Sequence, residues 1–247
     1  MLNLKELSAE PYATILCYPR SSKAELRKRL HELERLGVTA LEFVGEKNII
    51  NIPILGKGCV GIVIIAYSDG QKNALKVRRV DADRRSMRHE AEMLKKANSL
   101  SVGPELRKVG RDFLVMQFVE GSLLLPWIEK NMGKKRLRRV LRSVMEQCFV
   151  LDRAGLDHGE LSRAPKHIIV DAADRSFIVD FESASDKRRP ANVTSVSQYL
   201  FLHGETAKKI NRQLGAVDEK IVLSSLRRYK HDAKRENFEV LLEACGL

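Results

Sequence analysis

The sequence predicts an α+β protein with two lobes, in which strands dominate the first half of the chain and helices dominate the second. Residues 39–79 hold short runs of aliphatic and β-branched residues separated by turn-forming residues, a pattern typical of strands. From residue 134 onward, apolar residues recur at helical spacing. The chain has 247 residues, of which 44% are hydrophobic, so one or two domains with packed cores are expected.

The N-terminal segment predicts a short strand at residues 13–18 and then a helix over residues 22–36. Ser22 and Glu25 form a capping box at the start of this helix, and Gly37 follows its last residue. Further strands are expected at residues 39–44, 48–55, 62–67 and 73–77.

The last two of these strands flank Asp69 and Gly70, which predict a hairpin because glycine tolerates the positive φ of a tight turn. A helix over residues 84–98 and a strand over residues 113–119 follow. The second half predicts an amphipathic helix at residues 134–154, two short strands near 168–170 and 177–180, and three or four terminal helices.

The composition narrows the classes of function. Lysine and arginine total 44 against 32 acidic residues, a net charge of +12 that favours an acidic partner. The four cysteines form no CxxC pair, which is typical of free thiols in a reducing compartment. The longest apolar run, residues 62–67, is too short to span a membrane. We therefore expect a cytoplasmic protein without a membrane partner.

A glycine-rich loop lies between two predicted strands. Residues 55–63 read LGKGCVGIV and place Gly56, Gly58, Gly61 and Val63 in the pattern GxGxxGxV. A dinucleotide fingerprint would continue into a helix and a Walker loop would continue with Gly-Lys-Ser/Thr, and neither follows here. Such a loop lets backbone N–H groups approach a triphosphate without Cβ clashes. The alternative is a glycine-rich hairpin without a ligand.

The strand after the hairpin carries a lysine suited to bind phosphate. Strand alternation puts Ala74 and Lys76 on one face, with Lys76 directed under the glycine loop. The next helix supplies Glu90 as a partner for the ammonium, whereas Glu92 projects elsewhere around the helix. The alternative is an edge-strand lysine in solvent.

Together with three later segments, these motifs resemble the protein-kinase superfamily. Residues 113–121 (FLVMQFVEG) look like its hinge, residues 156–162 (LDHGELS) like its catalytic loop, and residues 178–182 (IVDFE) like its metal-binding DFG segment. The glycine after the histidine of the catalytic loop is similar to the small atypical, RIO-like kinases, especially the predicted archaeal Ser/Thr protein kinases.

This resemblance implies a bilobal protein-kinase-like fold with a strand-rich N-lobe (51–119) and a reduced helical C-lobe (120–247). Residues 1–50 would be an α/β extension packed on or leading into the N-lobe. It also implies an atypical Ser/Thr protein kinase that transfers the γ-phosphate of ATP to a protein hydroxyl, its own included. The implied ATP-binding residues are Gly56, Lys57, Gly58, Gly61, Val63, Ala74, Lys76, Glu90, Met116, Gln117 and Val119.

The resemblance assigns catalysis to Lys76, Glu160 and Asp180, with Asp180 as ligand of Mg²⁺ or Mn²⁺. Glu160 stands where the family has Asp, Glu182 where it has Gly, and either would supply the metal with a second carboxylate. The expected Asn is missing, because its place is taken by Pro165, or by His167 if the following strand is matched. Imidazole is a poor ligand for Mg²⁺.

Two alternative functions remain open. One is a nucleotide-binding pseudokinase or a regulatory module associated with RNA or the ribosome, with little or no phosphotransfer. The other is a small-molecule phosphotransferase. Four basic clusters would serve an RNA or ribosomal partner, or simply form solvated surfaces: 78–79 with 84–85, 134–142, 187–189, and 227–230 with 234–235.

Overall fold

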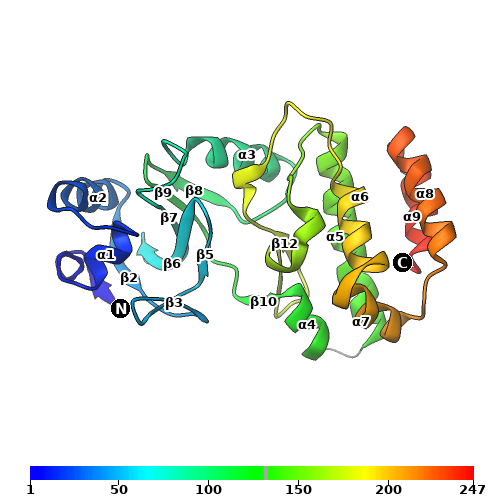
Figure 1. Ribbon diagram of the computed structural model, residues 1–247, viewed down its shortest axis with the longest axis horizontal. Helices are drawn as coiled ribbons and strands as arrows, with labels where there is room; N and C mark the ends of the chain where they lie inside the picture. Colours follow the sequence, from blue (N-terminus) through cyan, green and yellow to red (C-terminus); the bar gives the residue numbers. More distant parts are fainter. Residues whose placement is uncertain (131–132) are drawn as a thin grey trace. The chain divides into compact units, whose positions relative to one another are not determined.

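The computed structural model describes residues 1–130 and 133–247 (Figure 1). The chain forms two compact units. The first unit comprises Met1–Lys95 and Pro104–Phe118, and the second comprises Lys96–Gly103 and Val119–Leu247. Sheet dominates the first unit and helix the second, which confirms the predicted α+β class with a strand-rich first half.

The first unit is built on a twisted antiparallel sheet, in which the strand order is β1-β2-β6-β7-β9-β8 and β5 pairs with β6. The strands are β1 (Leu2–Asn3), β2 (Val38–Glu42), β5 (Gly56–Lys57), β6 (Gly61–Ser68), β7 (Gln71–Arg78), β8 (Leu106–Val109) and β9 (Phe113–Gln117). Because β2 pairs with β6, the segment 1–50 shares this sheet and its core.

The predicted hairpin joins β6 to β7. Asp69 and Gly70 both have positive φ, 52° and 70°, as a two-residue turn between right-twisted strands requires. The pairing places Val63 opposite Lys76 and Gly61 opposite Arg78. The glycine loop and the lysine therefore lie on adjacent strands.

Two predictions for the N-terminal segment are wrong. Residues 13–18 do not form a strand, since α1 (Tyr12–Leu16) is helical and Ile15, Leu16 and Cys17 are all fully buried in succession. A short apolar run of this kind does not distinguish the two structures by periodicity. Residues 48–55 are not one strand but the hairpin of β3 (Lys47–Ile49) and β4 (Ile52–Ile54), turning at Ile50 and Asn51.

The helices of the first unit follow their sequence signals more closely. Helix α2 (Lys23–Arg35) begins after Ser22, whose hydroxyl accepts a hydrogen bond from the Glu25 backbone at 3.2 Å. Helix α3 (Arg88–Ser99) starts four residues later than expected, and its last turn belongs to the second unit.

The second unit packs helices against a small antiparallel sheet, β10 (Gly121–Leu123), β11 (Ile168–Asp171) and β12 (Ser176–Ile178). Its helices are α4 (Leu124–Lys130), α5 (Lys134–Arg153), α6 (Asn192–Ser197), α7 (Gly204–Leu214), α8 (Glu219–His231) and α9 (Arg235–Ala244). A π-helical turn, Gln198–Leu202, follows α6. Short 3₁₀ turns occupy Leu161–Lys166 and Phe181–Ser183.

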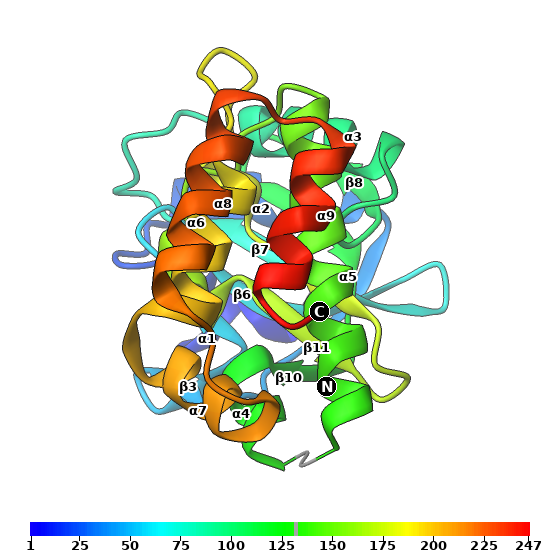
Figure 2. The same cartoon turned by 90° about the vertical axis from the view of Figure 1, so that its right-hand side faces the viewer.

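Helix α5 is the centre of this unit and confirms the amphipathic helix predicted at residues 134–154. Its apolar face, including Leu137, Val140 and Val144, is completely buried. Helices α8 and α9 lie side by side over it (Figure 2), and Phe149 stacks on Phe238 with ring centroids 4.5 Å apart. Within the described residues, no helix has both the length and the apolar character needed to cross a bilayer.

Candidate functional site

The glycine loop between β5 and β6 is a tight turn held by its own backbone and by one arginine. The N–H of Gly58 donates to the carbonyl of Gly61 at 2.8 Å. The backbone N–H of Arg79 donates to the Val60 carbonyl at 2.8 Å, and its guanidinium donates to the Gly58 carbonyl at 3.2 Å. The loop is therefore preorganised, with its carbonyls engaged on the side of Arg79.

The glycines of this loop differ in how much space the surrounding residues leave for a side chain. A Cβ on Gly61 would lie 2.9 Å from the Val77 carbonyl and 3.1 Å from Cγ of Lys76, so this position must be glycine for the lysine to pass. A Cβ on Gly58 would lie 3.5 Å from the Gly61 carbonyl oxygen, and a Cβ on Gly56 would lie 3.7 Å from Cβ of Val63, both at ordinary contact distance. Neighbouring residues of the chain therefore do not explain why these two positions are glycine.

Lys76 and Glu90 form a buried ion pair in the first unit. The Lys76 Nζ lies 2.9 Å from a carboxylate oxygen of Glu90, and the two side chains are 5% and 4% exposed. Strand β7 positions the lysine and the first turn of α3 positions the glutamate. The geometry expected from the sequence for this pair is present, and Glu92 is exposed.

The remaining expected ATP-binding residues lie on two strands and the segment after them. Ala74 is buried in β7 opposite Met116 of β9. The backbone N–H of Gln117 donates to the Glu105 carbonyl at 2.8 Å, so this donor is already used within the first unit. Val119 is the second unit's first residue after β9. Lys57 stacks its ammonium over the Tyr18 ring at 4.7 Å from the centroid.

In the second unit, the segment resembling a catalytic loop is anchored by His158. This ring is fully buried, and its Nε2 lies 3.0 Å from the Val179 carbonyl. Burial lowers the pKa of His158 to about 4, with the neighbouring His167 contributing in the same direction. His158 is therefore neutral at pH 7, and Nε2–H donates to the carbonyl that precedes Asp180.

Gly159 follows, and no other residue fits there. Its φ is +87°, and a Cβ would lie 2.2 Å from the guanidinium of Arg188 and 2.8 Å from the Ser183 carbonyl. Arg188 donates hydrogen bonds both to that carbonyl and to Asp157. The glycine thus lets Arg188 join the two segments that carry Glu160 and Asp180.

Glu160, His167 and Asp180 form a chain of contacts. The Glu160 carboxylate accepts a hydrogen bond from the Ser183 hydroxyl and lies 3.2 Å from Nε2 of His167. On the opposite side of the ring, Nδ1 of His167 lies 3.9 Å from Oδ2 of Asp180. The imidazole is 6% exposed, whereas the two carboxylates are about one-third exposed, at 36% and 35%.

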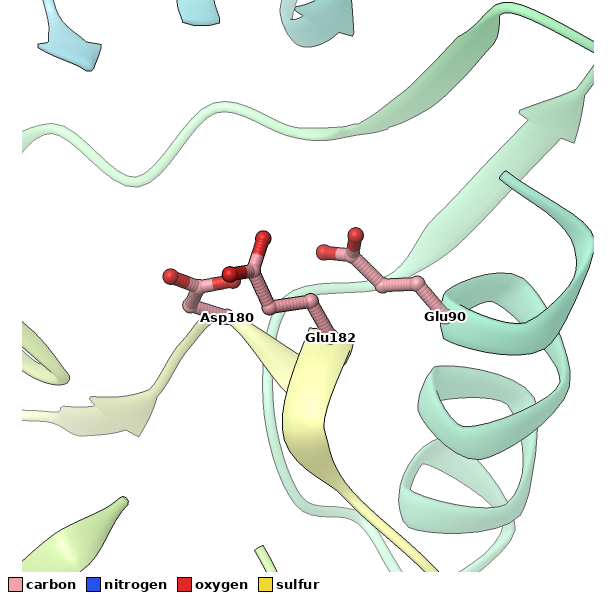
Figure 3. Close-up of side chains that lie close together, drawn as sticks. All are labelled: Glu90, Asp180 and Glu182. Carbon is pink, nitrogen blue, oxygen red and sulfur yellow. The ribbon is translucent and has the colours of Figure 1, made fainter. Parts of the chain in front are cut away.

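Asp180 and Glu182 present two carboxylates from the same turn. Asp180 has φ 71° and ψ 73°, a left-handed conformation that is rare for a residue other than glycine and that clusters at functional sites. Carboxylate oxygens of Asp180 and Glu182 lie within 4.8 Å of one another (Figure 3). Glu90, also drawn there, belongs to α3 of the first unit. Oxygen donors so spaced fit a divalent cation.

Three residues that position this loop were not found by sequence reasoning. Asn192 donates to the Leu156 carbonyl at 2.8 Å and accepts from the His158 backbone, while Ser183 and Arg188 hold the turn from the other side. Their partners are 20 or more positions away in the sequence or depend on tertiary packing. No pattern within a short stretch of sequence predicts such contacts.

Some of the side chains in the basic clusters form ion pairs within the chain. Arg78 is buried against Asp112 and is not a surface residue. The other ion pairs join Arg79 to Asp81, Arg136 and Arg139 to Asp174, Arg142 to Glu239, Arg188 to Asp157, Lys234 to Asp232, and Arg235 to Glu146. For the cations that have carboxylate partners, these contacts weaken the interpretation of the clusters as a phosphate-binding surface.

Comparison with known proteins gives a limited result. No model of a known protein family matches the chain. The chain is similar to an uncharacterised protein of the archaeon Methanocaldococcus jannaschii, MJ1211, with 29% identity over 117 residues. The match covers 47% of this chain and 98% of that protein.

Proposed function

We propose that the protein is an ATP- and metal-dependent phosphotransferase of the atypical Ser/Thr protein-kinase kind. The observation that carries this proposal is the buried Lys76–Glu90 pair beside the glycine loop. Desolvating two charges costs several kcal/mol per ion, and a well-packed apolar pair is often at least as stable. A lysine held rigidly under a glycine loop is instead explained by a need to position its charge on a phosphate.

The first unit would bind the nucleotide's phosphates. The loop around Gly58 would bring its backbone N–H groups, other than that of Gly58 itself, close to the phosphates, where a side chain would obstruct them. Lys76, oriented by Glu90, would contact the α- and β-phosphates. Lys76 is buried and already paired with Glu90, which reduces the side-chain entropy lost on binding.

The second unit would supply the carboxylates. Asp180 and Glu182 would hold the divalent cation, which when bound neutralises charge on the β- and γ-phosphate oxygens. Glu160 would orient the acceptor hydroxyl and take its proton as the new oxygen–phosphorus bond forms and the bond to the β-phosphate oxygen breaks, releasing ADP. Each oxygen of Glu160 has a second lone pair beyond those that face Ser183 and His167.

The test is incubation with γ-labelled ATP and Mn²⁺ or Mg²⁺, with counting of protein-bound label and free phosphate. We expect the wild-type chain to produce protein-bound label or free phosphate. In Asp180→Ala this product should fall at least about 100-fold, as expected for the loss of a catalytic group. Asp186→Asn, an exposed carboxylate of the same unit, is the matched control and should keep wild-type turnover.

Other outcomes of this assay separate the alternatives. ATP binding that leaves the γ-phosphate in place in every variant would favour the nucleotide-binding pseudokinase. Label that appears only on an added small alcohol or sugar would favour the small-molecule phosphotransferase.

A further inference from the structure

The further inference concerns Tyr18, a half-buried residue of the N-terminal segment that contacts two cations beside the glycine loop. Nζ of Lys57 lies 4.7 Å from the centroid of the Tyr18 ring, and the guanidinium carbon of Arg79 lies 5.0 Å from it. Both distances are within the range of about 6 Å over which a cation is attracted to an aromatic ring. Lys57 belongs to β5 at the start of the loop, and Arg79 directly follows β7. One ring therefore contacts cations from both strands that flank the loop's turn.

Arg79 connects this ring to the backbone of the loop. Its guanidinium donates to the carbonyl of Gly58 at 3.2 Å and to the two carboxylate oxygens of Asp81 at 2.9 Å and 2.7 Å. A free arginine side chain has many rotamers, and ordering it costs conformational entropy. Because the ring of Tyr18 and the carboxylate of Asp81 both hold the guanidinium, its N–H stays directed at the Gly58 carbonyl.

The backbone on either side of this contact is also fixed. The N–H of Val80 donates to the Tyr18 carbonyl at 2.9 Å. Nη1 of the fully buried Arg29 donates to the carbonyls of Leu16 and Arg78, both at 2.6 Å. A buried guanidinium is tolerated only where its donors find such partners. The segments that carry Tyr18 and Arg79 are therefore joined through their main chains as well as through the ring.

The face of the Tyr18 ring makes these contacts, and its hydroxyl does not. Within residues 1–130 and 133–247, the Tyr18 hydroxyl has no hydrogen-bond partner. Attraction between a cation and an aromatic ring depends on the ring's face, which tyrosine and phenylalanine share. Phenylalanine is therefore the conservative replacement at this position, and leucine is the replacement that removes the interaction.

We infer that Tyr18 is a positioning residue for the glycine loop, which it holds in its tight turn through Lys57 and Arg79, and that it thereby sets the affinity for ATP. The inference rests on the proposed function in that the loop is the phosphate site there. It also gives the N-terminal segment, residues 1–50, a part in that site. A loop that is already ordered loses less entropy when it binds a ligand, so loss of the ring should weaken binding.

Hydrogen exchange of the loop amides, followed by nuclear magnetic resonance without nucleotide, tests whether the ring holds the loop. The reporters are the N–H groups of Gly58 and Arg79, which donate to the carbonyls of Gly61 and Val60. In Tyr18→Leu both should exchange about 5- to 30-fold faster, as expected for the loss of two exposed cation–π contacts. Tyr18→Phe should keep the wild-type exchange rates.

Tyr12→Leu is the matched control. Tyr12 is also a half-buried residue of the N-terminal segment and packs against the same core, but its ring contacts Phe43, with centroids 5.1 Å apart. This variant should leave the exchange of the loop amides at the wild-type rate. Unchanged loop exchange in folded Tyr18→Leu would overturn the inference. Equal acceleration in Tyr12→Leu would also overturn it, since a general loosening of the segment would then be the cause.

A second variant leaves the core untouched. Lys57 is exposed, and Lys57→Met removes one of the two contacts, so the Gly58 amide should exchange about 2- to 5-fold faster. Its control is Lys72→Met, because Lys72 is also exposed and its ammonium lies 4.6 Å from the centroid of a different ring, that of Phe118. Exchange of Gly58 that is unchanged in Lys57→Met, or that rises equally in Lys72→Met, would contradict the inference.

Kinetics with ATP separate a positioning role from a purely structural one. Tyr18→Leu should raise the KM for ATP about 5- to 30-fold and leave kcat unchanged, whereas Tyr18→Phe should have the wild-type KM. Faster loop exchange with an unchanged KM would overturn the positioning role. A wild-type chain that does not bind ATP would count against the proposed function, and loop exchange that depends on the ring would still support the role of Tyr18 in holding the loop.

Discussion

The buried ring of His158 donates a hydrogen bond to the carbonyl of Val179 across 3.0 Å. The N–H of Val179 in turn donates to the His167 carbonyl at 2.9 Å. The segments at His158, His167 and Val179 are thereby joined directly before Asp180. The unusual left-handed backbone of Asp180 is stabilised by this framework, since such a conformation persists only where its surroundings determine it.

His158 makes the stability of the protein depend on pH. Its pKa is about 4 in the folded chain, against 6.5 for an unburied histidine, so between these values the unfolded chain binds a proton that the folded chain does not. The contribution is fully present above pH 6.5 and is lost as the pH falls to 4. We expect it to remove about 2 kcal/mol of unfolding free energy between pH 7 and pH 5.

Urea unfolding at these two pH values measures this effect. His158→Gln, which retains an N–H donor, should show a smaller loss than the wild type, while His203→Asn should show the wild-type loss. Equal losses in all three chains would contradict the assignment to His158.

Because Lys76 and Glu90 are buried together, removing one of them should destabilise the protein more than removing both. Lys76→Met leaves a buried carboxylate facing an apolar chain and should lower the free energy of unfolding by about 3–5 kcal/mol. The double variant Lys76→Met/Glu90→Met should cost much less than the sum of the single changes. Lys95→Met, exposed on α3, should change stability by less than about 0.5 kcal/mol. Additive effects would show that the pair is not energetically coupled.

The glycine loop predicts different effects at two of its glycines. Gly61→Ala places a methyl group 2.9 Å from the Val77 carbonyl and should lower the unfolding free energy by about 1–3 kcal/mol. Gly58→Ala meets nothing nearer than 3.5 Å, so its stability should stay within about 0.5 kcal/mol of the wild type. If the loop binds ATP, Gly58→Ala should nevertheless raise the KM for ATP roughly ten- to hundredfold. Thermal unfolding measures the stability of each variant, and nucleotide titration measures its affinity for ATP. Unchanged ATP binding in Gly58→Ala would count against the loop as a phosphate site.

Replacing Gly159 should lower activity, because an added methyl group would meet the Arg188 guanidinium and the Ser183 carbonyl. Gly159→Ala forces a methyl group against Arg188 and the Ser183 carbonyl at a φ of +87°, which strains the backbone by about 1–3 kcal/mol. We expect Glu160 to be displaced and turnover to fall on the order of 100-fold. Gly155→Ala is the control, because it also has positive φ but its Cβ meets nothing within 4 Å. An equal fall in turnover in the two variants would show that strain at a positive φ causes the loss of activity, and that the contacts of the added methyl group do not.

Much of the fold follows from patterns within short stretches of sequence. The N-cap at Ser22, the hairpin at Asp69 and Gly70, and the apolar face of α5 all appear where they were predicted. Each depends on residues that are close in sequence, so it can be predicted without knowledge of the tertiary structure. The errors fall where a short apolar run has no periodicity, as at residues 13–18.

The candidate site divides in the same way. The sequence by itself determined the α+β class, the glycine loop, and the placement of Lys76 on a strand and Glu90 on the following helix. Only the tertiary structure decided that His167 lies between Glu160 and Asp180, that the Ser183 carbonyl leaves no room for a side chain at Gly159, and that Arg78 is buried against Asp112. The physical reason is that strand and helix periodicity is set by the local backbone, whereas the partner of a charged side chain is selected by packing between distant segments.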